Sequence, residues 1–200
     1  MSNDMFGWED NLAYGLTHKN GNSEYGNQLM AMLTLKGIYG YELYDSNGVL
    51  KSFDTNLRNG ITNQGKNYAL DAIFRGATDG PQLSPWYFGI IDSSGYVAVA
   101  VGDTHGLHSG WNEFATYSDA TRIAWVESAA AGQLITNAAP STFGINGGGT
   151  LKGVFLASNS TKSSTANAAT DKIWSTVLFS ANVAVVNGDT LKITYTVNAG

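Results

Sequence analysis

The residues with the clearest chemical potential are two histidines and a nearby carboxylate. Asp103, His105 and His108 place these groups within six residues, and both types are ligands that zinc accepts. A zinc site needs three or four converging ligands, however, and histidines three residues apart in a glycine-containing loop have no defined geometry. We therefore predict that these histidines cap turns or pack on Trp111, and we expect no metal.

Arg122 is the only cation among residues 76–151, a stretch that also contains six acidic residues. We predict a bidentate, partly buried ion pair with one of these carboxylates, because guanidinium and carboxylate groups match in two parallel hydrogen bonds. Trp111, Glu113 and Tyr117 lie close to Arg122 in the sequence. We interpret the group as a structural brace for its loop; the alternative is an interface anchor, a role in which Trp, Tyr and Arg are common.

Motifs for enzymatic catalysis are missing from the sequence. The chain has no Cys, so thiol chemistry is excluded, and neither a Gly-x-Ser-x-Gly turn nor a phosphate-binding loop occurs. Asp103, Glu113 and Asp119 are candidates for the paired carboxylates of a glycosidase, but we expect them to face solvent. The prediction is a non-enzymatic protein without a cofactor.

Composition and charge narrow the class of protein and its partners. The 200 residues include 24 Gly and are 43% hydrophobic, which predicts a folded β-rich chain that is long enough to bury a core. The net charge is −5 and no basic stripe occurs, so nucleic acid is not expected as a partner. No apolar run approaches the roughly 18 residues of a membrane helix, and residues 1–10 show no secretory signal.

The elements predicted from pattern are mostly strands. Apolar residues alternate from Leu33 to Leu43, and the pattern resumes after Asn47-Gly48, a dipeptide that favours a tight hairpin turn. A near-continuous apolar run at 86–92 predicts a central strand with both faces buried. Further strands are expected at 121–126, 174–179 and 191–197, and a hairpin with a glycine loop is expected at 143–157.

One helix is predicted, at residues 63–75. Thr62 can cap its first turn and Gly76 can end it. The apolar residues on one side of this helix predict packing on a face or edge of a sheet. They are Tyr68, Ala69, Ala72 and Ile73, with Leu70 and Phe74 widening the face.

Residues 1–28 lack a sustained period of 2 or 3.6, and we interpret them as an N-terminal arm that precedes a single domain at 29–200. Aromatic side chains are unfavourable in water, so the arm needs a partner surface on its own domain or on a neighbour. The residues expected to bind that surface are Met5, Phe6, Trp8, Leu12 and Tyr14.

A succession of motifs runs through residues 59–197. It comprises Asn63-Gln64-Gly65 with Ala69-Leu70-Asp71, Trp86-Tyr87-x-Gly89-Ile90-Ile91, Trp111-Asn112-Glu113 with Tyr117 and Arg122, Gly153-x-Phe155-Leu156, and Trp174-Ser175 with Gly188-Asp189-x-Leu191-x-Ile193-x-Tyr195. This succession resembles a group of small β-rich structural proteins from tailed-bacteriophage virions. The resemblance implies an antiparallel β-sandwich of jelly-roll type. We expect one sandwich core that contains Trp86, Phe88, Ile90, Phe155, Trp174, Leu178 and Tyr195.

The resemblance also implies a role in the virion. We expect a capsid decoration (cement) protein that is assembled in the host cytoplasm, lies on the capsid surface and binds the major capsid protein. The alternatives are a tail or fibre adaptor, or a receptor-binding protein. A carbohydrate-binding or glycan-degrading sandwich is a third class, in which exposed Trp8, Trp86, Trp111, Trp125 or Trp174 would stack on sugars. The lightly charged segment Val183–Val186 predicts a sheet edge, and hence a homo-oligomer, either a dimer or a trimer.

Overall fold

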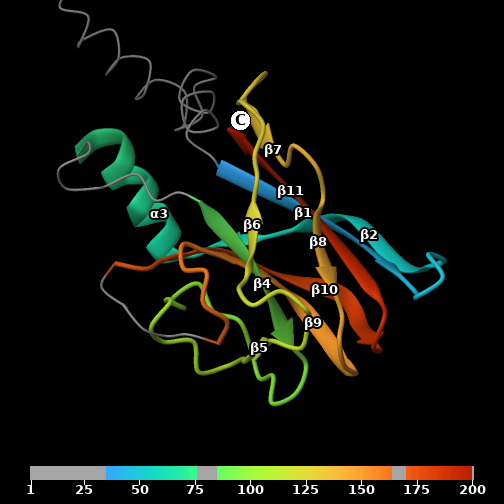
Figure 1. Cartoon of the computed structure of the whole chain (residues 1–200). Helices are drawn as coiled ribbons and strands as arrows, with labels where there is room; N and C mark the ends of the chain where they lie inside the picture. Colours follow the sequence, from blue (N-terminus) through green and yellow to red (C-terminus); the bar gives the residue numbers. More distant parts are fainter. Residues whose placement is uncertain (1–34, 76–84, 164–169, 200) are drawn as a thin grey trace, which may run out of the picture.

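Two antiparallel β-sheets face each other and form a sandwich (Figure 1). The computed structural model describes residues 35–75, 85–163 and 170–199. Within these ranges the first sheet has the order β2–β1–β11–β7, with β8 also paired to β11. The second has the order β3–β10–β9–β4–β5, with β6 also paired to β4. The predicted fold class, a mainly β antiparallel sandwich with one short helix, is confirmed.

The first sheet consists of β1 (Leu35–Tyr44), β2 (Leu50–Arg58), β7 (Leu134–Thr136), β8 (Ser141–Gly144) and β11 (Thr190–Ala199). The second consists of β3 (Gly60–Ile61), β4 (Trp86–Asp92), β5 (Glu113–Phe114), β6 (Ile123–Trp125), β9 (Gly149–Ala157) and β10 (Ile173–Val185). The arm at 1–28, its boundary with the domain and its five apolar residues lie outside the described residues. No helix in the described part is long and apolar enough to cross a membrane.

The hairpin between β1 and β2 forms where the sequence predicts it. The Asp45 carboxylate accepts hydrogen bonds from the backbone N–H groups of Asn47 and Val49, each at 2.8 Å. Gly48 has a φ of 79°, a conformation that glycine adopts without the steric cost of a side chain. The prediction of an antiparallel pair that meets at Asn47-Gly48 is therefore confirmed.

The predicted helix is present and joins the sandwich through its first turn. The Thr62 hydroxyl accepts a hydrogen bond from Gly65 N–H at 2.9 Å and donates one to the Ile173 carbonyl at 2.5 Å. A Cβ atom at Gly65 would collide with the Trp174 carbonyl, so only glycine allows this close approach to β10. Helix α3 (Asn63–Leu70) then continues as the π-helical turn η1 (Asp71–Arg75).

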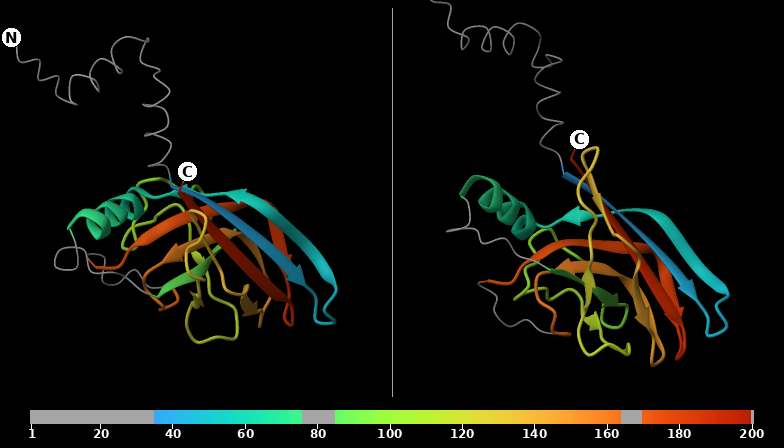
Figure 2. Two further views of the ribbon diagram at one scale, coloured as in Figure 1. Left: turned by 90° about the horizontal axis from the view of Figure 1, so that it is seen from above. Right: turned by 45° about the horizontal axis from the view of Figure 1, so that its top comes forward.

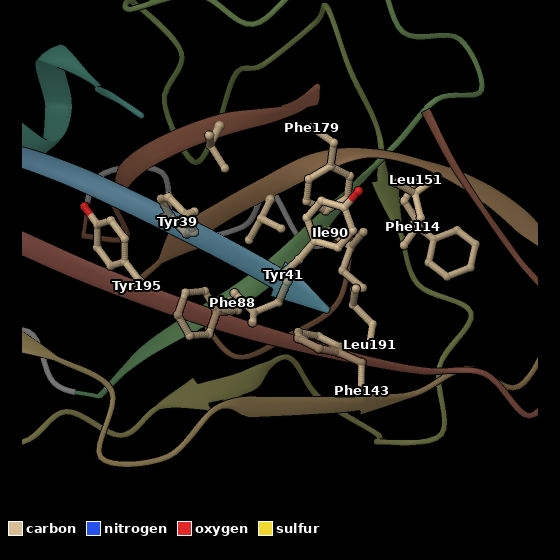
Figure 3. Close-up of a cluster of buried hydrophobic side chains, with 14 of the residues drawn as sticks. Tyr39, Tyr41, Phe88, Ile90, Phe114, Phe143, Leu151, Phe179, Leu191 and Tyr195 are labelled. Carbon is tan, nitrogen blue, oxygen red and sulfur yellow. The ribbon is translucent and has the colours of Figure 1, made fainter. Parts of the chain in front are cut away.

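The main core lies between the two sheets and is rich in aromatic rings (Figure 3). The rings of Tyr39 and Tyr195 are stacked with their centroids 4.1 Å apart, and Phe88 meets Tyr39 edge-on at 6.1 Å. A hydrogen bond of 2.7 Å joins the Tyr39 hydroxyl to Ser175 Oγ. Burial raises the pKa of both tyrosine hydroxyls above the usual value, so they remain neutral hydrogen-bonding groups inside the sandwich.

A second apolar cluster covers the outer face of the second sheet, and it corrects the prediction of a single core. Phe155 is buried there with Ile91 and Trp111, and Leu178 packs at its margin. Phe155 lies across Gly89 on the neighbouring strand, where a Cβ atom would overlap its ring. The side chains of a strand alternate between faces, so β4 and β9 supply apolar residues to both clusters. The predicted burial of both faces at 86–92 is thus confirmed.

Trp86 and Trp174 also depart from the predicted core. Phe88, Ile90 and Tyr195 are buried between the sheets as expected. Trp86 and Trp174 are only half-buried and pack against the margin of this main core. Their strands begin at one open end of the sandwich, where the opposite sheet does not fully cover them.

The hairpin predicted at 143–157 does not form. Strand β8 pairs with β11 in the first sheet, whereas β9 pairs with β4 and β10 in the second. The glycines at 147–149 therefore carry the chain from one sheet to the other. The sequence pattern locates both strands correctly, but pairing is decided by the side chains that β8 and β9 direct into the core from opposite sides.

The core predicts a sharp contrast between two phenylalanines. Phe88 is fully buried, whereas Phe53 on β2 is 62% exposed. We expect Phe88→Ala to lower the free energy of unfolding by about 3–5 kcal/mol and Phe53→Ala to change it by less than about 0.5 kcal/mol. Urea denaturation of both variants measures the difference, and similar losses for the two would contradict the placement of the core.

Candidate functional site

The Arg122 side chain forms the ion pair that the sequence predicts. Its Nη2 lies 2.8 Å from Glu113 Oε2, and its Nε lies 3.0 Å from Glu113 Oε1. Both side chains are 2% exposed, so the pair is more deeply buried than expected. Because a buried charge is stable only when it is paired and hydrogen-bonded, each partner depends on the other.

The same pair connects two separate loops. Arg122 donates from Nη1 to the Asn159 carbonyl at 2.8 Å and from its backbone N–H to the Ser160 carbonyl at 2.7 Å. Glu113 in turn accepts from the Ser163 N–H at 2.6 Å. The loop that follows β9 is thereby attached to the segment 113–122.

Lys162 extends this connection to Tyr117. Its ammonium group donates to the Tyr117 carbonyl at 2.8 Å and lies 3.6 Å from the centre of the Tyr117 ring. Partial burial lowers the pKa of Lys162, while burial raises the pKa of the Tyr117 hydroxyl well above its usual value. The tyrosine ring itself packs edge-on against Phe143 in the main core at 5.0 Å.

Trp111, His105 and His108 lie between β4 and β5, and their contacts differ from those of the ion pair. The Trp111 indole N–H donates to Asp103 Oδ2 at 2.8 Å, and the His108 ring stacks on the indole at 3.9 Å. The buried His105 lies with Nε2 3.3 Å from Arg122 Nη1. His108 thus packs on Trp111 as predicted, and in the described part of the chain no three acidic or histidine side chains converge as metal ligands.

The four residues singled out in the sequence therefore form one buried unit. Trp111 and the Arg122–Glu113 pair hold the long loop between β4 and β6 on the side of the outer cluster, and Tyr117 anchors the same loop in the main core. Their burial supports the interpretation as a brace and leaves little surface for an interface anchor. Asp103 and the side chain of Glu113 are buried too, which corrects the expectation that both face solvent, whereas Asp119 is exposed.

The larger site is an apolar groove at the open end of the sandwich, between the helix and the two sheets. Its volume is about 810 Å³, within the range of ligand-binding pockets. Among the described residues that line it none carries a charge. The side chains that shape it include Leu35, Tyr68, Ile73, Trp86, Trp125 and Trp174.

Aromatic rings form the floor of this groove. Trp86 meets Tyr68 edge-on at 5.5 Å and Trp174 at 6.1 Å. The indole N–H of Trp174 donates to the Tyr195 hydroxyl at 2.8 Å, and that of Trp125 donates to Asn137 Oδ1 at 3.0 Å. These two polar groups are therefore engaged within the protein, and the groove offers mainly ring surface and aliphatic side chains to a guest.

The apolar face of the helix is the one signal for this groove in the sequence, and we interpreted it as a face that packs on a sheet. Tyr68, Ala69, Ala72 and Ile73 were expected to pack on a sheet, but Ile73 is 69% exposed and the neighbouring Leu70 is 55% exposed. The helix is attached through Thr62 and Gly65 at its first turn, so its second half stands away from the sheets. The apolar face therefore forms one wall of the groove.

Comparisons of the sequence with protein-family models and with curated proteins find no match. The groove and the brace are thus interpreted from their own chemistry. The groove has the size and surface of a site that binds apolar side chains.

The buried ion pair predicts that the stability of the fold depends strongly on Arg122 and Glu113. Arg122→Met leaves Glu113 buried without its cation, and we expect a loss of about 3–5 kcal/mol in the free energy of unfolding. The double variant Glu113→Leu/Arg122→Met removes both charges and should be less destabilised than the single variant. Arg58→Met, at an exposed position on β2, serves as the control. Denaturation curves that give equal stabilities for Arg122→Met and Arg58→Met would contradict the brace.

Proposed function

We propose that this protein is a non-enzymatic structural protein of a tailed-bacteriophage virion, and within that class a capsid decoration protein that binds major capsid subunits. The resemblance of residues 59–197 to such proteins supports the proposal. So does the fold, because a small antiparallel sandwich with an apolar groove and few surface charges is suited to protein–protein contact.

The observation that carries the proposal is the length of chain that precedes the first described strand. The first described strand begins at Leu35, so 34 residues precede it. An extended chain reaches about 3.3 Å per residue, and residues 1–25 could therefore span roughly 80 Å. In the proposed role the arm crosses from one coat subunit to the next and docks there with its aromatic side chains.

Energetic considerations favour a docked arm that also forms backbone hydrogen bonds. Ordering the arm costs roughly 1–2 kcal/mol per residue. Burial of Met5, Phe6, Trp8, Leu12 and Tyr14 contributes about 1.5–3 kcal/mol each, which offsets only part of that cost. Addition of the arm as a strand to a sheet of the partner supplies the remaining interactions.

Self-association is part of the proposal. Strand β10 pairs with β9 along much of its length, but on its other side it pairs, within the described ranges, with β3 at Ser175 and Thr176 alone. Residues 183–185 therefore lie along a sheet edge, as the sequence predicted, and a second copy can cover such an edge. We propose a dimer or trimer, for which sedimentation at micromolar concentration is the test; a monomer both free and on the particle would contradict it.

The carbohydrate-binding alternative has less support. It requires exposed tryptophan faces with polar groups around them, but Trp111 and Trp125 are buried. Trp86 and Trp174 line a groove in which, among the described residues, Tyr68 has the one hydroxyl group, and the indole N–H groups of Trp125 and Trp174 are already engaged within the protein. A sugar would leave its hydroxyl groups without partners there.

Copy number separates decoration from a tail role. We expect the protein in purified particles of the phage that encodes it at a number comparable to that of the major capsid protein, because a decoration protein occupies repeated sites on the shell. Quantitative mass spectrometry of the particles measures this ratio. A handful of copies per particle would support a tail or fibre adaptor instead, and its absence from particles would contradict a virion role.

Deletion of the arm predicts loss of particle binding without loss of the fold. We expect a variant that lacks residues 2–25 to keep the cooperative unfolding transition of the sandwich but to fail to occupy particles. Co-sedimentation with particles that lack the protein and thermal unfolding are the two measurements. Full occupancy by the truncated protein would contradict the arm as anchor, and an unfolded sandwich would show that the arm belongs to its own core.

A further inference from the structure

The apolar groove lies where the N-terminal arm joins the sandwich. Leu35, the first residue of β1, is itself one of the residues that line the groove. The chain that precedes it therefore starts from the groove wall. Ile73 on the opposite wall is 69% exposed and Leu35 is 37% exposed, which leaves apolar surface on both sides available for a partner.

The arm has the side chains that this groove accommodates. Phe6, Trp8 and Tyr14 follow one another among small and polar residues. Aromatic rings pack favourably edge-on or offset against other rings, and the floor of the groove presents Trp86 and Trp174 in that manner. The absence of charge among the described lining residues also suits such a guest, because no buried charge loses its hydration.

We propose that, in the free protein, the groove binds the aromatic segment 5–14 of its own arm. Twenty residues, 15–34, connect this segment to Leu35, and a flexible chain of that length has a root-mean-square span of about 25 Å. Such a tether holds its end at an effective concentration in the millimolar range. The arm of a second copy reaches this concentration only in a dense assembly, so the protein's own arm is the favoured occupant.

The segment 76–84 is the other stretch to compare, since it connects η1 to β4 in the sequence and both elements contribute residues to the groove. Its composition makes it a poorer guest. It contains no aromatic residue, and Leu83 is its one large aliphatic side chain. The arm provides five large apolar side chains within ten residues.

Docking in the groove would give the arm two alternative partners. In the free protein its aromatic side chains are covered by the groove, and on the particle they are released to a neighbouring subunit. The contact with the groove does not depend on the proposed virion role, because it involves this chain alone. It would limit non-specific association of the free protein through exposed aromatic residues.

Site-specific cross-linking tests the proposal in the full-length protein. Because the chain has no Cys, two introduced cysteines are the only reactive thiols. Asn11→Cys places one in the arm, and Ala130→Cys places the other at an exposed position on the groove. The matched control combines Asn11→Cys with Ser46→Cys in the loop after β1. This loop lies at the opposite end of the sandwich from α3, as both views of Figure 2 show.

A free arm can reach both positions, since the 23 residues between Asn11 and Leu35 extend to roughly 80 Å. We expect a short bis-maleimide to form an intramolecular link at least tenfold faster with Ala130→Cys than with Ser46→Cys. Adding Trp8→Asp to the first pair should lower its rate severalfold. Adding Ile73→Asp should do the same, whereas Leu107→Asp, at an equally exposed site away from the groove, should not.

Three results would overturn the proposal. Equal rates for the two cysteine pairs would show that the arm has no preference for the groove. A covalent dimer as the main product would identify the arm of a second copy as the occupant. A rate for the Ala130→Cys pair that neither aspartate substitution lowers would show that the aromatic contact is not the cause of the preference. Particle occupancy is measured separately, so failure here is distinguishable from failure of the virion role.

Discussion

Burial of both faces of the second sheet is the constraint on which the rest of the structure depends. Strands β4 and β9 direct apolar side chains to both sides, so each face of this sheet must be covered by another part of the chain. The first sheet covers one face through a regular strand ladder. The loop between β4 and β6 covers the other with little regular structure, and it is held by buried polar contacts, chiefly the pair of Arg122 with Glu113 and the bond from Trp111 to Asp103. Apolar burial thus depends on electrostatic contacts.

Features set by neighbouring residues could be predicted from the sequence. The turn at Asn47-Gly48, the Thr62 cap and the apolar run at 86–92 each depend on a few adjacent positions, and all three are present. The pairing of β8 and β9 could not be predicted, because it depends on residues far apart in the chain. The prediction that Phe155 lies in a single sandwich core was wrong for the same reason. Alternation along a strand separates its two faces but does not say which segment of the chain covers each face.

The candidate site shows the same division. A carboxylate partner for Arg122 was predictable because few cations compete for the acidic residues around it, whereas the contacts to Asn159 and Ser160 come from a distant loop. The groove was not predicted, although the apolar face of the helix that forms one of its walls is visible in the sequence. It forms because Gly65 attaches the helix at its first turn, so Ile73 lies apart from the sheets. The brace and the groove consequently occupy separate parts of the sandwich, one maintaining the fold and the other offering a surface.

The inward hydrogen bonds of the groove tryptophans have a consequence for how this surface can vary. Trp125 and Trp174 are each anchored by an indole N–H, so their rings are held in place before any guest arrives. Recognition then relies on ring shape and apolar area, with few polar groups to match. A guest segment could exchange Phe, Tyr and Trp, or shift their spacing, and still fit. Over evolution, the segment that binds here is free to diverge in sequence while the rings beneath it stay the same.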